Sequence, residues 1–187
     1  VHPAVPGVGQ HANLGDLVPR RMPVVLAGEV QPTVGAGSGR LELADWVASK
    51  SNPLAARVMA NRVWMLHFGQ GLVRTPGDFG KQGRPPTHPE LLDYLASEFM
   101  ESGWSLKHLH RLMMGSATYQ QASGGNTLSA TQDPDNQLFA RMNRRKIEAE
   151  AVRDSLLAAS GRLDLTLGGM AVTDIATPRR TLYLRTV

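Results

Sequence analysis

Residues 54–68 read LAARVMANRVWMLHF, and this stretch decides the fold that the sequence predicts. Apolar side chains occur on most sides of a helix built from it, which is typical of a central helix covered by its neighbours. Asn52-Pro53 precedes it as a helix-start signal, with Asn as the N-cap and Pro at the first helical position. Gly69 follows as the stop signal. The largest aliphatic side chains of the stretch are expected in the core: Val58, Met59, Val63 and Leu66.

Two more helices are predicted directly downstream. Residues 87–90 read Thr-His-Pro-Glu, a capping box in which the Thr hydroxyl and the Glu carboxylate bind the first free backbone donors. Gly103 ends this helix and Ser105 caps the next, so the short connection predicts two antiparallel neighbours. A further helix is predicted over residues 146–160. Its inward side chains are expected to include Ile147, Val152 and Leu156.

The composition supports a helical domain. The chain has 187 residues, of which 42% are hydrophobic, and this is enough for one domain with its own core. Only 5% are aromatic, so the core must consist mainly of Leu, Val, Met and Ala, most of which favour helices. We therefore expect a mainly α fold, an irregular helical bundle with an extended Gly/Pro-rich N-terminal arm and long ordered loops.

The sequence changes character at residue 40. Residues 1–39 hold much of the Gly and Pro and are interpreted as an extended arm or linker, with a short strand at 24–27. Residues 40–187 form the expected helical domain, which begins with a short amphipathic helix. The chain starts with Val1 and ends within the apolar and charged alternation of residues 181–185. This pattern predicts a domain truncated at its C-terminal end.

Charge and cysteine content exclude several kinds of site. There are no cysteines, which excludes disulfides, thiolate metal sites, thiol nucleophiles and a Cys-x-x-Cys-His haem attachment within this chain. No apolar run approaches the length of a membrane span. The net charge of +4 could attract acidic polymers, but the basic clusters at 141–146 and 179–185 lack interleaved aromatics, so nucleic acid is not favoured as a partner. Pairing with the acidic residues of the 146–160 helix explains them more simply.

Asn61-Arg62 is a polar pair inside the otherwise apolar central helix. Such groups are costly to bury unless they are hydrogen-bonded. One interpretation makes Asn61 and Arg62 a ligand-binding site, with Arg62 donating two hydrogen bonds to an anion. The other makes them a buried network that ties the helix to the Gly-rich loop, in particular to Asp78. The sequence favours the network.

His67 and His88 flank the Gly-rich loop, and Asp78 lies between them in the sequence. If the loop folds back, these three candidate catalytic residues could form an acid/base or metal set. The alternative is that His67 ends one helix and His88 begins another, and this alternative is favoured. His108 and His110 point to different faces of a helix, so no metal site is expected. We expect an ordered loop, with Phe79 packed in the core and the Asp78 carboxylate held by Arg62 or by backbone donors.

Several short motifs occur in an order that identifies a family resemblance. They are Asn61-Arg62-Val63-Trp64, His67-Phe68-Gly69, Gly71-Leu72-Val73, Thr75-Pro76, Asp78-Phe79-Gly80, Pro86 to Leu92, Ser102 to Lys107, Ser116 to Gln121, Asp133 to Asn136, and Arg141 with Asn143-Arg144-Arg145. Over residues 40–185 the chain resembles the uncharacterised C-terminal domain of planctomycete-type cytochrome c domain-containing proteins. It departs from the family pattern in lacking the upstream domains and in stopping before the last third.

The resemblance implies neighbouring domains and a cellular location rather than a reaction. The family is a domain of unknown function, joined to a second uncharacterised domain and often to a haem-binding domain upstream, in proteins with secretion signals. It therefore implies an exported protein, in the periplasm or at the cell surface. Haem would belong to a separate upstream domain, and no cofactor is expected in this chain. The expected partners are the other domains of the parent chain, with polysaccharide as a further partner. No catalytic residue is carried over.

Two functions remain open from the sequence. The first is an interaction or scaffold domain of a secreted multidomain protein, beside a haem-bearing or carbohydrate-related partner. The alternative is a hydrolase-like enzyme acting on polysaccharide, with its site near the loop from Gly69 to His88. One deep pocket lined by His67, Asp78, His88 and Arg62 would favour the enzyme. For this chain alone, the sequence leans away from catalysis.

Overall fold

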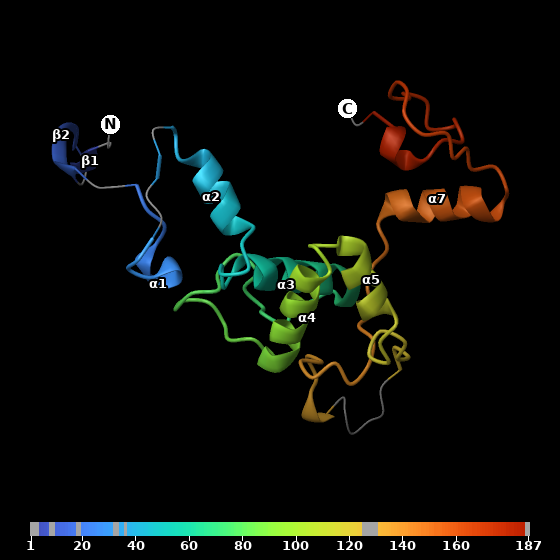
Figure 1. Cartoon of the computed structure of the whole chain (residues 1–187). Helices are drawn as coiled ribbons and strands as arrows, with labels where there is room; N and C mark the ends of the chain where they lie inside the picture. The colour runs from blue at the N-terminus through green and yellow to red at the C-terminus, as the bar shows by residue number, and fades with distance from the viewer. Residues whose placement is uncertain are drawn as a thin grey trace. The chain divides into compact units, whose positions relative to one another are not determined.

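The structure is a computed structural model. It describes residues 4–7, 10–17, 20–31, 34–35, 37–124 and 131–185, and only the backbone of the first two of these ranges. The chain divides into two compact units, Val1–Asn143 and Arg144–Val187. Helices are the main regular elements of the described residues in both, as Figure 1 shows, so the predicted mainly α fold is confirmed.

The first unit begins with a small hairpin and then becomes helical. Its elements are β1 (Ala4–Gly7), β2 (Gln10–Leu17), α1 (Val24–Ala27), α2 (Arg40–Val47), α3 (Ala55–Phe68), α4 (Pro89–Glu101) and α5 (Leu106–Met114). β1 and β2 pair antiparallel, with Ala4 opposite Leu17. The strand predicted at 24–27 is wrong, because the Leu26 and Ala27 amides donate back to the Pro23 carbonyl and close a helical turn. The Gln31 side chain secures this turn through hydrogen bonds to both backbone groups of Met22.

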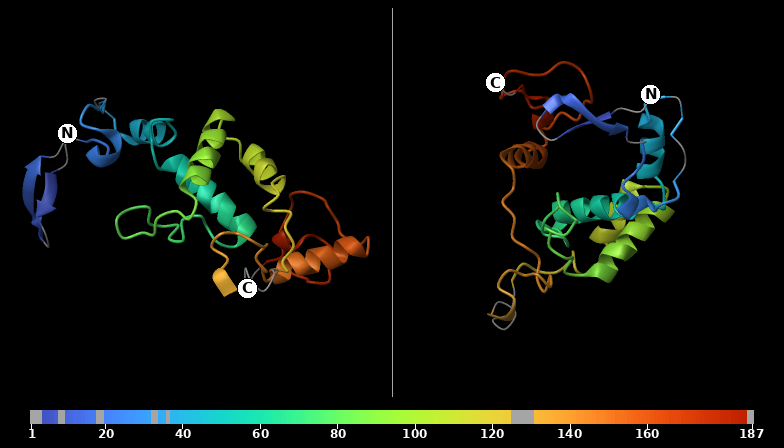
Figure 2. Two further views of the ribbon diagram at one scale, coloured as in Figure 1. Left: turned by 90° about the horizontal axis from the view of Figure 1, so that it is seen from below. Right: turned by 90° about the vertical axis from the view of Figure 1, so that its left-hand side faces the viewer.

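Helix α3 is the centre of the first unit and packs against both α4 and α5, which also contact each other. The three helices lie together in both views of Figure 2. Just before α3, the Asn52 side chain accepts hydrogen bonds from the amides of Leu54 (2.9 Å) and Ala55 (3.0 Å). Asn52 thus binds free donors as predicted, but the helix begins at Ala55 rather than at Pro53. At its end Gly69 adopts a left-handed conformation with φ of 81°, which suits a residue without Cβ.

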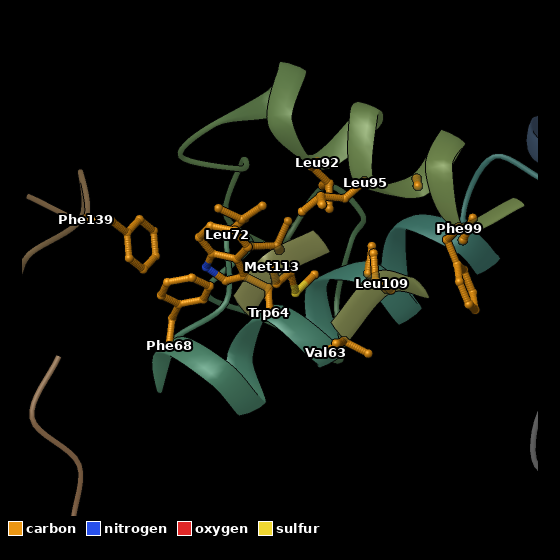
Figure 3. Close-up of a cluster of buried hydrophobic side chains, with 14 residues drawn as sticks. Val63, Trp64, Phe68, Leu72, Leu92, Leu95, Phe99, Leu109, Met113 and Phe139 are labelled. Atoms are coloured by element: carbon orange, nitrogen blue, oxygen red, sulfur yellow. The ribbon is translucent and has the colours of Figure 1, made fainter. Parts of the chain in front are cut away.

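The core of the first unit is built on one face of α3. Trp64 stacks on Phe68 with ring centroids 3.9 Å apart, and the Phe139 ring meets both edge-on (Figure 3). The buried apolar residues are Ala56, Ala60, Val63, Trp64, Phe68, Leu72, Val73, Leu92, Leu95, Ala96, Phe99, Leu109, Met113 and Phe139. The prediction that Met59 and Leu66 are buried is wrong, because they lie on the other side of α3 and are 37% and 60% exposed.

The two helices that cover α3 differ in how they begin. Ser105 caps α5 as predicted, because its hydroxyl accepts a hydrogen bond from the His108 amide at 3.3 Å. The predicted capping box of α4 is wrong: the helix begins at Pro89 without a side-chain cap. The Thr87 amide instead donates to the Leu72 carbonyl at 2.9 Å, and its hydroxyl points to the same oxygen. Thr87 thus closes the base of the preceding loop rather than capping a helix.

The second unit contains α7 (Ala149–Ala159) and the short 3₁₀ helix η1 (Thr181–Tyr183). Loops connect them, with single bridges between Asp164 and Arg179 and between Val172 and Leu184. In residues 144–185, the part of this unit that the structure describes, no residue is fully buried. The expectation that the apolar side chains of the α7 region point inward is wrong: Ile147, Val152 and Leu156 are all exposed.

Two arginines organise the loops of the second unit. Arg153 on α7 donates to four oxygens, the backbone carbonyls of Arg179, Ile175 and Thr177 and the Thr181 hydroxyl, at 2.7–3.1 Å. Arg179 donates to the carbonyls of Thr166 (3.0 Å) and Gly168 (2.6 Å) and stacks over the Tyr183 ring. The planar fork of a guanidinium can satisfy several carbonyls at once, so these side chains hold loops that carry no apolar core.

Asp154 links α7 to η1. Its Oδ1 accepts hydrogen bonds from the amide and the hydroxyl of Thr181, at 2.8 and 2.6 Å. These hydrogen bonds, with smaller contributions from Arg180 and Arg153, lower the pKa of the Asp154 carboxyl. The predicted pairing of an acidic residue of this helix with the basic cluster is thereby confirmed. Across the described part of both units, no helix has the length and apolar character needed to cross a membrane.

Candidate functional site

The loop after α3 is fixed to that helix by Asn61. Asn61 is fully buried, and its side chain makes two hydrogen bonds to Val73: Nδ2 donates to the carbonyl at 3.1 Å and Oδ1 accepts from the amide at 2.8 Å. This is the pattern of a buried polar network, which satisfies a group that would otherwise destabilise the core. Asn61 therefore positions the loop. Because Arg74 directly follows Val73, this anchor also places Arg74.

Gly71 allows the loop to approach Asn61 this closely. A Cβ on Gly71 would lie 2.8 Å from both Asn61 side-chain polar atoms and 2.6 Å from the Val73 carbonyl oxygen. Any other residue would force these groups apart, because real Cβ atoms do not come so near. The glycine and the asparagine thus act as one unit in holding the start of the loop.

The far part of the loop is held by Thr75. Its hydroxyl donates to the Asp78 carbonyl at 2.8 Å and accepts from the Arg84 amide at 3.0 Å. The Asp78 carboxylate accepts from the Gly80 amide at 2.7 Å. The expected ordered loop and the backbone donor for Asp78 are therefore confirmed, and Phe79 packs against the core. Of the two expected partners of this carboxylate, Arg62 or backbone donors, the structure shows a backbone donor.

A pocket of about 590 Å³ opens beside this loop. It lies at the C-terminal end of α3 and is called the Arg74 pocket below. Its lining residues are Met65, Gly69, Gln70, Gly71, Arg74, Arg84, Pro85, Pro86, Thr87, Asp135 and Gln137. All belong to the first unit, so the pocket is complete within it.

Two residues that line the Arg74 pocket carry enclosed polar atoms without a hydrogen-bond partner. Nε and Nη2 of Arg74 and Oε1 of Gln70 are shielded from solvent, and no hydrogen-bond partner for them lies in the described part of the chain. Buried polar groups in native proteins are nearly always paired, and an unpaired group indicates a strained position or an absent water, ion or ligand. Gln70 and Arg74, which both line the pocket, share this property.

Another part of the pocket lining is carried by the segment that leads to Asn143. Asp133 accepts hydrogen bonds from the amides of Gln137 (2.8 Å) and Leu138 (2.7 Å). The hydrogen bonds from these amides, of which the one from Leu138 contributes most, lower the pKa of the Asp133 carboxyl. Asn143 Nδ2 donates to the Phe68 carbonyl at 2.8 Å and so attaches the segment to the end of α3. The pocket residues Asp135 and Gln137 are positioned by these contacts.

The three predicted catalytic residues have separate neighbours. His67 Nε2 and His110 Nδ1 lie 2.7 Å apart, so one imidazole donates to the other, and the Tyr119 ring meets His67 edge-on. His88 Nδ1 lies 3.0 Å from the Thr87 hydroxyl, and Asp78 binds the Gly80 amide. The structure thus gives His67, Asp78 and His88 three different partners and does not gather them at the Arg74 pocket.

The two predicted ligand-binding residues also separate. Asn61 points inward to Val73, whereas Arg62 is exposed and lines a different, mainly apolar hollow with Trp46 and Trp104. In the described residues there is no group of three or more His, Cys, Asp or Glu side chains that could hold a metal ion.

Sequence reasoning missed the residues that the structure does bring together. Arg74 and Arg84 lie outside the motifs, and Asp135 lies in the Asp133–Asn136 motif, to which the sequence assigned no role. Only the density of glycines between residues 69 and 83 indicated that this loop approaches other groups closely. The His67–His110 contact joins α3 to α5, so the spacing of His108 and His110 within one helix does not reveal it. Pairs from different helices are not visible in local spacing.

Comparison with known proteins places the chain in a family without giving it an activity. No curated protein and no solved structure matches it. A family model matches residues 39–185, most of the chain. The chain therefore belongs to the family described as PSD1, "Protein of unknown function (DUF1553)".

Proposed function

We propose that this chain is an interaction or scaffold domain of an exported multidomain protein, and that the second unit provides its docking surface. The partner is another domain of the same parent chain. In the planctomycete-type setting implied by the sequence motifs, that partner is haem-bearing or carbohydrate-related. Haem belongs to a separate upstream domain, and the location is the periplasm or the cell surface.

The observation that carries this proposal is the apolar exposure of the second unit. Six large apolar side chains of its helix and loops are at least two-thirds exposed: Leu156, Leu165, Leu167, Met170, Ile175 and Leu182. Each would stabilise a complex by about 1.5–3 kcal/mol if it were fully covered. Single exposed apolar residues are ordinary, but six of them in a short unit without fully buried residues support a surface that contacts a partner.

The hydrolase-like alternative has less support. It required an acid/base set near the loop from Gly69 to His88, and the two histidines and Asp78 are engaged with separate neighbours. General acid/base chemistry needs its groups within hydrogen-bond reach of one reacting centre. The favoured role is therefore binding rather than hydrolysis.

The test measures binding between this chain and the neighbouring domains of its parent protein, produced separately. We expect saturable binding by calorimetry with the intact chain. The double variant Leu167→Ser with Met170→Ser removes two of the most exposed apolar side chains, 80% and 89% exposed, and should weaken binding at least tenfold.

A matched control is Val30→Ser in the first unit, where the side chain is 96% exposed. It should leave the affinity unchanged. Unaltered binding by the double variant, or no binding by the intact chain to any neighbouring domain, would contradict the docking role. Circular dichroism of each variant verifies that the fold is retained.

A further inference from the structure

We propose that the Arg74 pocket binds a small hydroxylated carboxylate, of the chemical class of a sugar acid. This site lies in the first unit and involves none of the apolar residues of the docking surface. It is therefore an additional function, and its test does not depend on the proposed docking.

The carboxylate partner is indicated by Arg74. Nε and Nη2 form the edge of a guanidinium that donates two parallel hydrogen bonds to the two oxygens of a carboxylate. In this protein both atoms are enclosed and make no hydrogen bond to the described residues, although the Arg74 charge lies near enough to Asp133 to help lower its pKa. Since neither atom has surface open to the pocket, a ligand carboxylate would satisfy them only after the Arg74 side chain turns toward the pocket that it lines. The Asn61–Val73 anchor holds the adjacent backbone in place for this contact.

The rest of the lining indicates hydroxyl groups on the same ligand. Arg84 supplies a second guanidinium, whereas Asp135 supplies a carboxylate that would repel a bare anion. A carboxylate oxygen accepts hydrogen bonds from hydroxyls, and the amides of Gln70 and Gln137 both donate and accept. A molecule with a carboxylate at one end and hydroxyls at the other matches Arg74 and Asp135 together, which sulfate or phosphate does not.

The size and the apolar part of the pocket agree with such a ligand. The volume of about 590 Å³ lies within the usual range for small-molecule sites. Met65, Pro85 and Pro86 offer surface for the C–H groups of a carbon skeleton. Among the described residues that line the pocket there is no aromatic ring on which a neutral sugar could stack. Affinity should therefore depend on the carboxylate.

The test is a calorimetric or NMR titration of the intact chain with three probes: D-glucuronate, D-glucose and inorganic sulfate. We expect saturable binding of glucuronate and at least tenfold weaker binding of both glucose and sulfate. Sulfate binding as tight as glucuronate binding would show a site for bare oxyanions and overturn the proposal. Equal binding of glucose, or no saturable glucuronate binding, would overturn it as well.

Substitutions identify the residues responsible. Arg74→Gln and Arg84→Gln should each weaken glucuronate binding at least tenfold. Because Arg84 is exposed, its variant keeps the test meaningful if the Arg74 variant fails to fold. Arg62→Gln, an exposed arginine on α3 outside the pocket, is the matched control and should bind as the unaltered chain does.

Asp135→Asn tests the contribution of the ligand's hydroxyl groups to affinity separately from that of its carboxylate. Removing this negative charge should weaken glucuronate binding but strengthen sulfate binding, because the repulsion of a bare anion is lost. If both affinities are unchanged, Asp135 does not face the ligand and the proposal fails. A loss of glucuronate binding in Arg62→Gln as large as in Arg84→Gln would likewise contradict it.

Discussion

The two units of this protein are stabilised by different interactions. The first packs apolar side chains of α3, α4 and α5 into a continuous core with stacked and edge-on aromatic rings. The second has no buried residue among those described and instead directs two arginines at the carbonyls of its loops. A short segment cannot exclude enough apolar surface from water to build a core of its own. Arginine-to-backbone hydrogen bonds organise such a segment while its apolar side chains stay available to a partner.

The largest expected effect is in the core of the first unit. Leu109→Ala removes a side chain that is 0% exposed and should lower the free energy of unfolding by about 2–5 kcal/mol. Leu66→Ala makes the same chemical change on the exposed side of α3 and should cost about 0.5 kcal/mol or less. Urea unfolding of both variants measures the difference. Similar costs would show that α3 is buried on all sides, as its sequence predicted.

A smaller and more local effect is expected in the second unit. Arg153→Ala removes the donor of four hydrogen bonds and should destabilise this unit by about 1.5–3 kcal/mol. The loss should appear as faster amide hydrogen exchange around residues 172–185, with α3 unaffected. Arg153→Lys tests the fork geometry, because a single ammonium cannot reach all four oxygens. If the Arg153→Lys variant keeps full protection from amide exchange, a positive charge alone is enough to hold these loops.

The comparison of the units also explains which parts of the fold could be predicted from the sequence. The helices of the first unit follow local signals: Asn52 and Ser105 bind the first free donors of their helices, and Gly69 ends α3. The wrong predictions of burial have one cause in common. Which face of an apolar helix is covered depends on neighbours distant in the sequence, so Leu66 was misplaced in α3 and Leu156 in α7.

The candidate site was predictable only as a region. The glycines of the loop after α3 indicated close approach, and the Asn61 network was one of the two interpretations given by the sequence. The identity of the pocket residues was not visible, because Arg74 and Asp135 come together through the anchors at Asn61 and Asn143. Contacts between residues so far apart in the chain leave no periodic pattern in the sequence.

The smallest expected effect is the response to acid. Hydrogen bonds from Thr181 lower the pKa of Asp154 below its ordinary value of 3.8. A lowered pKa means that the folded state favours the carboxylate, so the stabilising contribution is present above pH 3.8 and is lost as the pH falls below it. We expect hydrogen-exchange protection near Thr181 to decrease in this range, and Asp154→Asn to reduce the pH dependence. Protection that increases on acidification would contradict the assigned hydrogen bonds.

The most direct test of the difference between the two units is native-state amide hydrogen exchange of the unaltered chain. If the first unit alone has a core, the amides of α3 should exchange only through global unfolding. Those of α7 should exchange through local opening, at least a hundredfold faster, which corresponds to about 2.7 kcal/mol. Protection of α7 equal to that of α3, with the same dependence on denaturant, would show one cooperative core and contradict this account.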